Sequence, residues 1–151
     1  MTYVFQNPSD FILKTYLENA ETIAVVGLSN REETAAYKVA CYLQEVGYRL
    51  LPVNPKLAGQ KLLGQTVYAS LQDIPVSVDL VNVFRRSDAL PSVARDFLET
   101  DGQVFWTQLE LENQEAEQIL RQAGRDHIVM NRCIKLEHQR LLGDRQPDEQ
   151  L

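Results

Sequence analysis

The chain has 151 residues, a hydrophobic share of 44 % and a charged share of 24 %, which are ordinary values for one globular domain with a sizeable core. Its formal net charge of −6 argues against a protein that coats nucleic acid or an anionic membrane, because both partners require a basic surface. The sequence shows neither a signal peptide nor an apolar run of about 18 residues, so a cytoplasmic location is expected.

Five apolar segments are predicted to form the strands of one sheet. Residues 22–27 (TIAVVG) are a continuous β-branched run that ends in glycine, and the lack of alternation is typical of a parallel strand buried on both faces. The other predicted strands are residues 48–53, 78–84, 103–106 and 127–130, and Val67-Tyr68 is predicted to be a short extended piece.

Helical segments separate these strands. Asn30 and Glu33 have the spacing of a capping box and are predicted to begin the helix that ends at Gly47. The alternation of strands and helices predicts one Rossmann-like doubly wound α/β domain over residues 1–142, with a five-stranded, mainly parallel sheet and helices on both faces. A polar, mobile tail is expected over residues 143–151. The other predicted helices are residues 8–19, 70–74, 87–98, 113–123 and 134–141.

Doubly wound sheets bind ligands beyond the carboxyl ends of their strands, where the strand order reverses. At the end of the first predicted strand, Gly27 permits a tight turn, and the N–H groups that start the next helix attract phosphate. The alternative is a plain turn in which Gly27 only makes room. The phosphate-loop residues predicted here are Gly27, Leu28, Ser29, Asn30 and Arg31.

The second predicted strand ends in Asn54, Pro55 and Lys56. A domain that binds NAD usually has an acidic residue here, which holds the ribose hydroxyls, and three glycines in its first loop. This chain has one glycine and no acid at these places, and Lys56 suits an additional phosphate. The pattern therefore disfavours NAD, and the alternative is a rigid proline turn without a ligand role.

The third predicted strand ends in Phe84, Arg85 and Arg86. An arginine fork binds phosphate oxygens in a bidentate manner, so two adjacent arginines at this edge indicate an anionic ligand. The alternative is that Arg85 and Arg86 pair with carboxylates of the same chain, which are plentiful.

The last two strand ends add an aromatic ring and a thiol. Trp106 offers a flat apolar wall and Gln108 an amide, and the alternative is an indole buried in the core. Arg132 and Cys133 follow the fifth strand, with Lys135 close by, and the alternative there is an inert, buried cysteine. The spacing of His and Cys residues forms no metal-binding motif, so no metal is expected.

The strand-end segments, taken in order, resemble one family. VVGLS, AYK, PVNP, VFRRSD, WTQL and NRCIK are similar to segments of the small bacterial CoA-binding proteins, which are single-domain relatives of the CoA-binding domain in the succinyl-CoA synthetase α subunit. The similarity covers residues 10–142. It implies a Rossmann-like domain that binds coenzyme A where the strand order reverses.

The resemblance also implies roles for individual residues. CoA carries a diphosphate and a 3′-phosphate, so a carboxylate after the second strand would repel it, whereas Lys56 attracts it. Two departures from the family are Ala35-Ala36, where members often have Pro-Ser, and Glu110, where they tend to have glycine. The implied contacts are Gly27 and Ser29 in the phosphate loop, Tyr37 and Lys38 at the start of the next helix, Asn54 and Pro55 beside the adenosine, Phe84 and Arg85 after it, Trp106 and Gln108 as a wall, and Arg132, Cys133 and Lys135 in the closing segment.

The absence of a convincing activated nucleophile favours a non-catalytic module that binds CoA or an acyl-CoA. One alternative is an enzyme or partner subunit that acts on a CoA thioester, with Cys133 as its nucleophile or as the site of a mixed disulfide with CoA. A second alternative is an NAD(H)-binding redox sensor. A homodimer formed through an apolar patch of the N-terminal helix is also compatible with the sequence.

Overall fold

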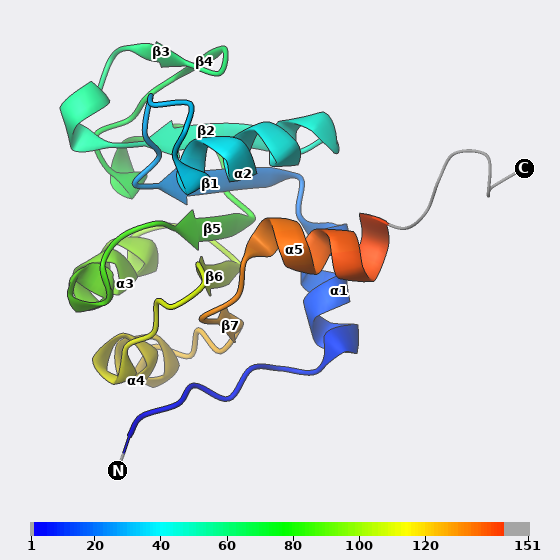
Figure 1. Cartoon of the computed structure of the whole chain (residues 1–151). Coiled ribbons are helices and arrows are strands. Elements are labelled where there is room, and N and C mark those ends of the chain that lie inside the picture. The colour runs from blue at the N-terminus through cyan, green and yellow to red at the C-terminus, as the bar shows by residue number, and fades with distance from the viewer. Residues whose placement is uncertain (1, 144–151) are drawn as a thin grey trace, which may run out of the picture.

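Five apolar runs become the strands of a parallel sheet in the computed structural model, which describes residues 2–143 (Figure 1). The order across the sheet is β2-β1-β5-β6-β7, and each neighbouring pair is parallel. The predicted doubly wound α/β fold is therefore confirmed. The strand bounds are β1 Thr22–Val26, β2 Arg49–Val53, β5 Leu80–Val83, β6 Val104–Thr107 and β7 Ile128–Val129.

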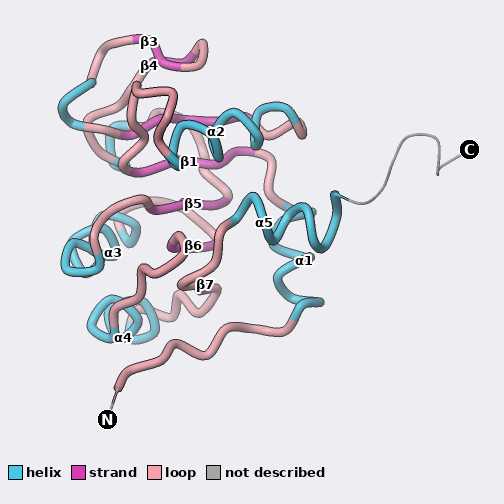
Figure 2. Tube along the Cα trace, in the orientation of Figure 1, coloured by secondary structure: helices cyan, strands magenta, loops and turns pink. Residues whose placement is uncertain are grey.

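Helices cover both faces of the sheet. Helices α1, α2 and α5 pack on one face, and α3 and α4 pack on the other (Figures 1 and 2). Their bounds are α1 Asp10–Asn19, α2 Ala35–Glu45, α3 Leu90–Leu98, α4 Gln114–Gln122 and α5 Ile134–His138. The short helical turns are η1 Pro55–Leu57, η2 Leu71–Asp73, η3 Ser87–Ala89 and η4 Gln139–Gly143.

Successive residues of β1 enter two separate cores. Ile23 and Val25 pack with Leu13 of α1, whereas Ala24 and Val26 pack with Phe97 of α3. All six side chains are buried, and complete burial of a large apolar side chain contributes about 1.5–3 kcal/mol to folding. A strand with apolar residues on both faces is stable only between two helical layers, which is why the run lacks alternation.

Helix α2 begins later than predicted. Its N-cap is Thr34, whose Oγ1 accepts a hydrogen bond from the Tyr37 N–H at 3.3 Å. The predicted capping box of Asn30 and Glu33 is therefore wrong, because Glu33 instead pairs with the Arg31 guanidinium at 2.9 Å. The consequence is a longer loop between β1 and α2.

Residues 61–66 form a small hairpin that the sequence did not reveal. Strands β3 Lys61–Leu62 and β4 Gln65–Thr66 pair antiparallel, and φ is positive at both turn residues, 53° at Leu63 and 78° at Gly64. Two-residue turns of this kind usually carry Asn or Asp at the first position, so a leucine there gave no signal. The predicted extended piece nearby is confirmed by a parallel bridge between Tyr68 and Val53.

The last helical turn, η4, reaches Gly143, and residues 144–151 of the predicted tail lie outside the described residues. Within residues 2–143, every helix is too short or too polar to cross a membrane.

Helix α5 brings His138 into a buried position beside two tyrosines. The Tyr42 hydroxyl lies 2.7 Å from His138 Nδ1, and the Tyr48 ring meets the imidazole edge to face with ring centroids 5.8 Å apart. Burial disfavours the charged imidazolium and lowers the pKa of His138 below its ordinary value of 6.5. The neutral ring accepts the tyrosine hydrogen bond, which protonation of Nδ1 would remove.

The lowered pKa of His138 predicts that stability falls as the pH decreases through about 6.5, because the unfolded chain then binds a proton that the folded chain rejects. His138→Gln should flatten the dependence of the unfolding free energy on pH between about 7 and 5, measured by urea denaturation. His127→Gln, at an exposed position, is the matched control and should keep the wild-type slope. An unchanged slope in His138→Gln would contradict the assignment.

Candidate functional site

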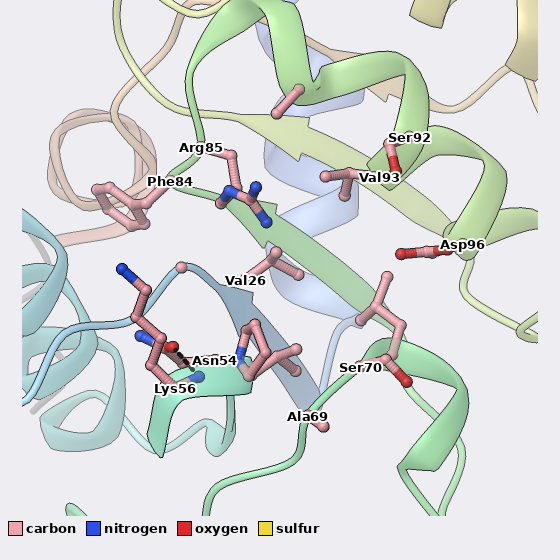
Figure 3. Close-up of a pocket in the computed structure, with 15 residues that line it drawn as sticks. Val26, Asn54, Lys56, Ala69, Ser70, Phe84, Arg85, Ser92, Val93 and Asp96 are labelled. Carbon is pink, nitrogen blue, oxygen red and sulfur yellow. Dashed lines mark hydrogen bonds between the residues drawn. The ribbon is translucent and has the colours of Figure 1, made fainter. Parts of the chain in front are cut away.

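The carboxyl ends of β1, β2 and β5 surround an opening at one edge of the sheet. Strand β1 lies between β2 and β5. The chain runs from β1 to β2 on one side and continues with β5 on the other side, so the strand order reverses at β1. A cavity of about 460 Å³ lies beyond these strand ends (Figure 3). Its lining comes from three strand-end loops, from the segment before and within η2, and from the α3 region: Val26, Gly27, Val53, Asn54, Pro55, Lys56, Ala69, Ser70, Leu71, Phe84, Arg85, Ala89, Ser92, Val93 and Asp96.

Gly27 allows the two central loops to approach each other closely. Its φ is 88°, and a Cβ placed on it would lie 2.3 Å from the carbonyl oxygen of Phe84. The Gly27 N–H also donates to the carbonyl of Val53 at 2.9 Å. Only glycine satisfies both the positive φ and the lack of space, so the expected tight turn lies at the centre of the sheet edge.

Asn54 connects the loop after β2 to the loop after β1. Its Nδ2 donates to the carbonyl of Leu28, and its Oδ1 accepts from the Lys56 N–H, both at 2.9 Å. The amide therefore has a structural role in capping η1, which Pro55 begins. Asn54, Pro55 and Lys56 all line the cavity, and their contact with a ligand stays a prediction.

Lys56 and Arg85 bring positive charge to one side of the cavity. They come from the loops after β2 and β5, and Figure 3 shows both side chains on the side opposite Asp96. Among residues 2–143, neither cation takes part in a salt bridge. Both arginines are exposed, but Arg86 differs from its neighbour because it pairs with Asp88 at 3.3 Å and is not part of the lining.

Beyond Gly27, the loop after β1 lies toward the α2 face and outside the cavity lining. Leu28 is fully buried in the core, so its side chain is not available to a ligand. Ser29 Oγ accepts from the Arg31 N–H at 3.0 Å, and the neighbouring Asn30 is exposed. Tyr37 and Lys38 lie in the first turn of α2, half-buried and exposed respectively.

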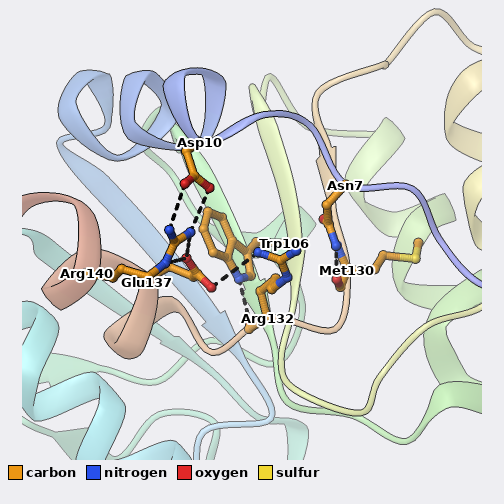
Figure 4. A network of polar contacts seen from close by, with 7 residues as sticks. All are labelled: Asn7, Asp10, Trp106, Met130, Arg132, Glu137 and Arg140. Atoms are coloured by element: carbon orange, nitrogen blue, oxygen red, sulfur yellow. Dashed lines mark hydrogen bonds and ion pairs between the residues drawn. The ribbon is translucent and has the colours of Figure 1, made fainter.

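Trp106 lies in the core and not at a ligand wall. Its ring is 0 % exposed, and its Nε1 donates to the carbonyl of Arg132 at 2.9 Å (Figure 4). The sequence predicted a strand that ends at Trp106, whereas β6 continues to Thr107, so the predicted ligand wall is wrong and the alternative of a core indole holds. The indole therefore positions the backbone at Arg132.

Arg132 belongs to a group of charged residues that joins the two ends of the described chain. We call Asp10, Arg132, Glu137 and Arg140 the C-terminal clasp (Figure 4). Glu137 accepts from Arg132 at 3.4 Å and from Arg140 at 2.5 Å, and Arg140 reaches both Asp10 oxygens at 2.8 Å. These bonds from Arg140 hold the pKa of Asp10 below its ordinary value.

The remaining predicted residues lie near the end of the sheet but outside the cavity lining. Gln108 is half-buried, and among the described residues its Oε1 has no hydrogen-bond partner. Cys133 is a half-buried free thiol at the N-cap of α5, and the Lys135 ammonium lies 5.6 Å from the centroid of the Tyr42 ring.

The residues that the sequence reasoning missed come from inside other elements. Ser70 and Leu71 lie at the start of η2, and Ser92, Val93 and Asp96 lie on α3. Ser92 and Asp96 are one helical turn apart and lie next to the apolar stripe of α3. The helical periodicity of the sequence could therefore have indicated that they share one side of the helix.

Comparison with known proteins gives consistent matches over most of the chain. A family model described as CoA binding domain matches residues 21–139. An uncharacterized protein of Bacillus subtilis, YneT, is 46 % identical over 133 residues, which is 88 % of this chain and 96 % of YneT. A solved protein of Thermus thermophilus is 38 % identical with a TM-score of 0.85, covering 89 % of this chain and all of that one. A hypothetical protein of Pyrococcus horikoshii is 33 % identical with a TM-score of 0.86, covering 94 % of this chain and all of that one.

Gly27→Ala should destabilise the fold more than Gly59→Ala. The two glycines have nearly the same φ, 88° and 87°, so alanine at either position costs about 1–2 kcal/mol in backbone strain. Only at Gly27 does the new Cβ also meet a carbonyl oxygen, since nothing lies within 4 Å at Gly59. Urea denaturation of both variants measures the difference, and equal losses of unfolding free energy would contradict the close approach.

Proposed function

The chain belongs to the CoA-binding domain family, and we propose that its sheet-edge cavity binds the nucleotide part of coenzyme A or of an acyl-CoA. The observation that supports this proposal is the pair of cations, Lys56 and Arg85, on one side of the cavity. Neither cation has a salt-bridge partner among residues 2–143, so both are available to phosphate oxygens.

Lys56 is assigned to the 3′-phosphate of CoA. It follows β2, the strand after which NAD-binding domains place an acid for the ribose hydroxyls. An acid there would repel a phosphorylated ribose, whereas an ammonium attracts it. Arg85 reaches the same side of the cavity from β5 and supplies a second charge, with guanidinium geometry that suits phosphate.

The diphosphate is assigned to the loop of residues 27–31 and to the start of α2. The first N–H groups of a helix, together with its dipole, favour a phosphate at that end. Ser29 and Arg31 supply polar groups in this loop, and Lys38 supplies an exposed charge in the first turn of α2. In this assignment the bound ligand extends from the cavity, past Gly27, to the face of the sheet that α2 covers.

We propose binding without a chemical step on the bound ligand. Cys133 is the one residue that the sequence suggested as a nucleophile, and it is not part of the cavity lining. On this basis residues 1–142 act as one ligand-binding domain.

Calorimetry with CoA and dephospho-CoA tests the assignment of Lys56. Wild-type protein should bind dephospho-CoA roughly ten- to a hundredfold more weakly, the size of one or two charge-assisted hydrogen bonds. Lys56→Gln should weaken CoA binding to about the level of dephospho-CoA and change dephospho-CoA binding little.

The matched control is Arg86→Gln, which removes a charge next to Arg85 but outside the cavity lining. It should leave the preference for CoA over dephospho-CoA intact. Equal weakening by Lys56→Gln and Arg86→Gln would indicate a general charge effect and contradict the site. Preferential binding of NAD, or no binding of CoA at millimolar concentration, would overturn the proposed function.

A further inference from the structure

The side of the cavity opposite the two cations carries a carboxylate. Asp96 lies on α3, and Figure 3 shows its side chain directed into the cavity across from Lys56 and Arg85. Asp96 takes part in no salt bridge within residues 2–143. The cavity is therefore cationic on one side and anionic on the other.

The Asp96 carboxylate is oriented by a neutral partner. Gln72 of η2 donates from Nε2 to Asp96 Oδ1 at 3.0 Å, which fixes the side chain without neutralising its charge. A carboxylate is an acceptor only, so Oδ2 is suited to a hydrogen-bond donor of a ligand.

Apolar side chains separate the charged sides of the cavity. Val26 and Val53 come from the strand ends, and Leu71 and Val93 come from η2 and α3. All four are mostly buried, and the part of each side chain that reaches the cavity is apolar and offers no hydrogen-bonding group. Such walls suit a flat, uncharged ring between them, as ligand sites with few polar groups generally do.

We propose that Asp96 accepts a hydrogen bond from the exocyclic amine of the adenine in bound CoA and thereby selects adenine in this cavity. The inference rests on the proposed function. CoA offers two uncharged donors in its nucleotide part, the adenine amine and the ribose 2′-hydroxyl. The hydroxyl is adjacent to the 3′-phosphate, so bringing it to Asp96 would bring that phosphate to a carboxylate. The amine lies at the other end of the nucleoside, away from the phosphates.

This orientation satisfies both sides of the cavity at once. The phosphate lies with Lys56 and Arg85, the base lies between the apolar walls, and the amine, a donor on adenine, reaches Asp96. The reverse orientation would place phosphate against the carboxylate and leave both cations without an anion. The arrangement of charge therefore determines the direction of the nucleotide.

The test compares CoA with etheno-CoA, in which the adenine amine is closed into a ring and no longer donates. Calorimetry on wild-type protein should show etheno-CoA binding roughly tenfold more weakly than CoA, as expected for one hydrogen bond to a charged group. Asp96→Ala should weaken CoA binding by a similar factor and should not weaken etheno-CoA binding further. Asp96→Asn should retain part of the CoA affinity, because its amide oxygen still accepts.

Glu99→Gln is the matched control, since it removes a negative charge just beyond the end of α3 and outside the cavity lining. Removal of an anion by itself should leave the binding of a polyanion unchanged or tighter. Unchanged or tighter CoA binding in Asp96→Ala would therefore overturn the inference, as would an equal loss for CoA and etheno-CoA. If wild-type protein binds no CoA, the proposed function falls and this inference falls with it.

Discussion

The close approach of Gly27 to the carbonyl of Phe84 is the constraint on which the sheet edge depends. Strands β1 and β5 are neighbours in the sheet, so the loops that follow them start side by side. Because Gly27 has no side chain, the two loops stay in contact for one more residue and then separate toward opposite faces. The cavity lies where they separate, and β2 and α3 complete its walls.

The polar groups around this edge divide into those that hold the loops and those that face the cavity. Asn54 and Ser29 have partners in the neighbouring backbone, and the Arg132 side chain is held by Glu137. Lys56, Arg85 and Asp96 keep their charges, and no salt bridge of the described chain includes them. The first group fixes the loops, and the second group, which is exposed or half-buried, can contact a ligand.

The sequence predicted the sheet and the strand-end loops well, because a buried parallel strand leaves a continuous apolar run that few other structures produce. It did not place Trp106 in the core, because sequence patterns do not fix the last residue of a strand. A shift of one residue at that end changes the environment of the side chain. Asp96 was not predicted, because it lies within α3 and not at a strand end, and the helix meets the cavity along its side. Contacts made by a helix flank depend on how the helix docks, and that is a tertiary property.

The C-terminal clasp has a consequence for the order in which the chain assembles. Asp10 and Arg140 are 130 positions apart, so their bond spans the longest stretch of chain among the side-chain hydrogen bonds within residues 2–143. Loop closure over such a distance has an entropic cost that the other contacts must first reduce. On the ribosome, strands β1, β2, β5 and β6 have all been synthesised by residue 107, whereas the bonds between Asp10 of α1 and Arg140 can form only after η4 has been made. Leu13 of α1 can pack against β1 early, but the clasp that ties α1 to the last helical turn forms only when the other elements have been synthesised.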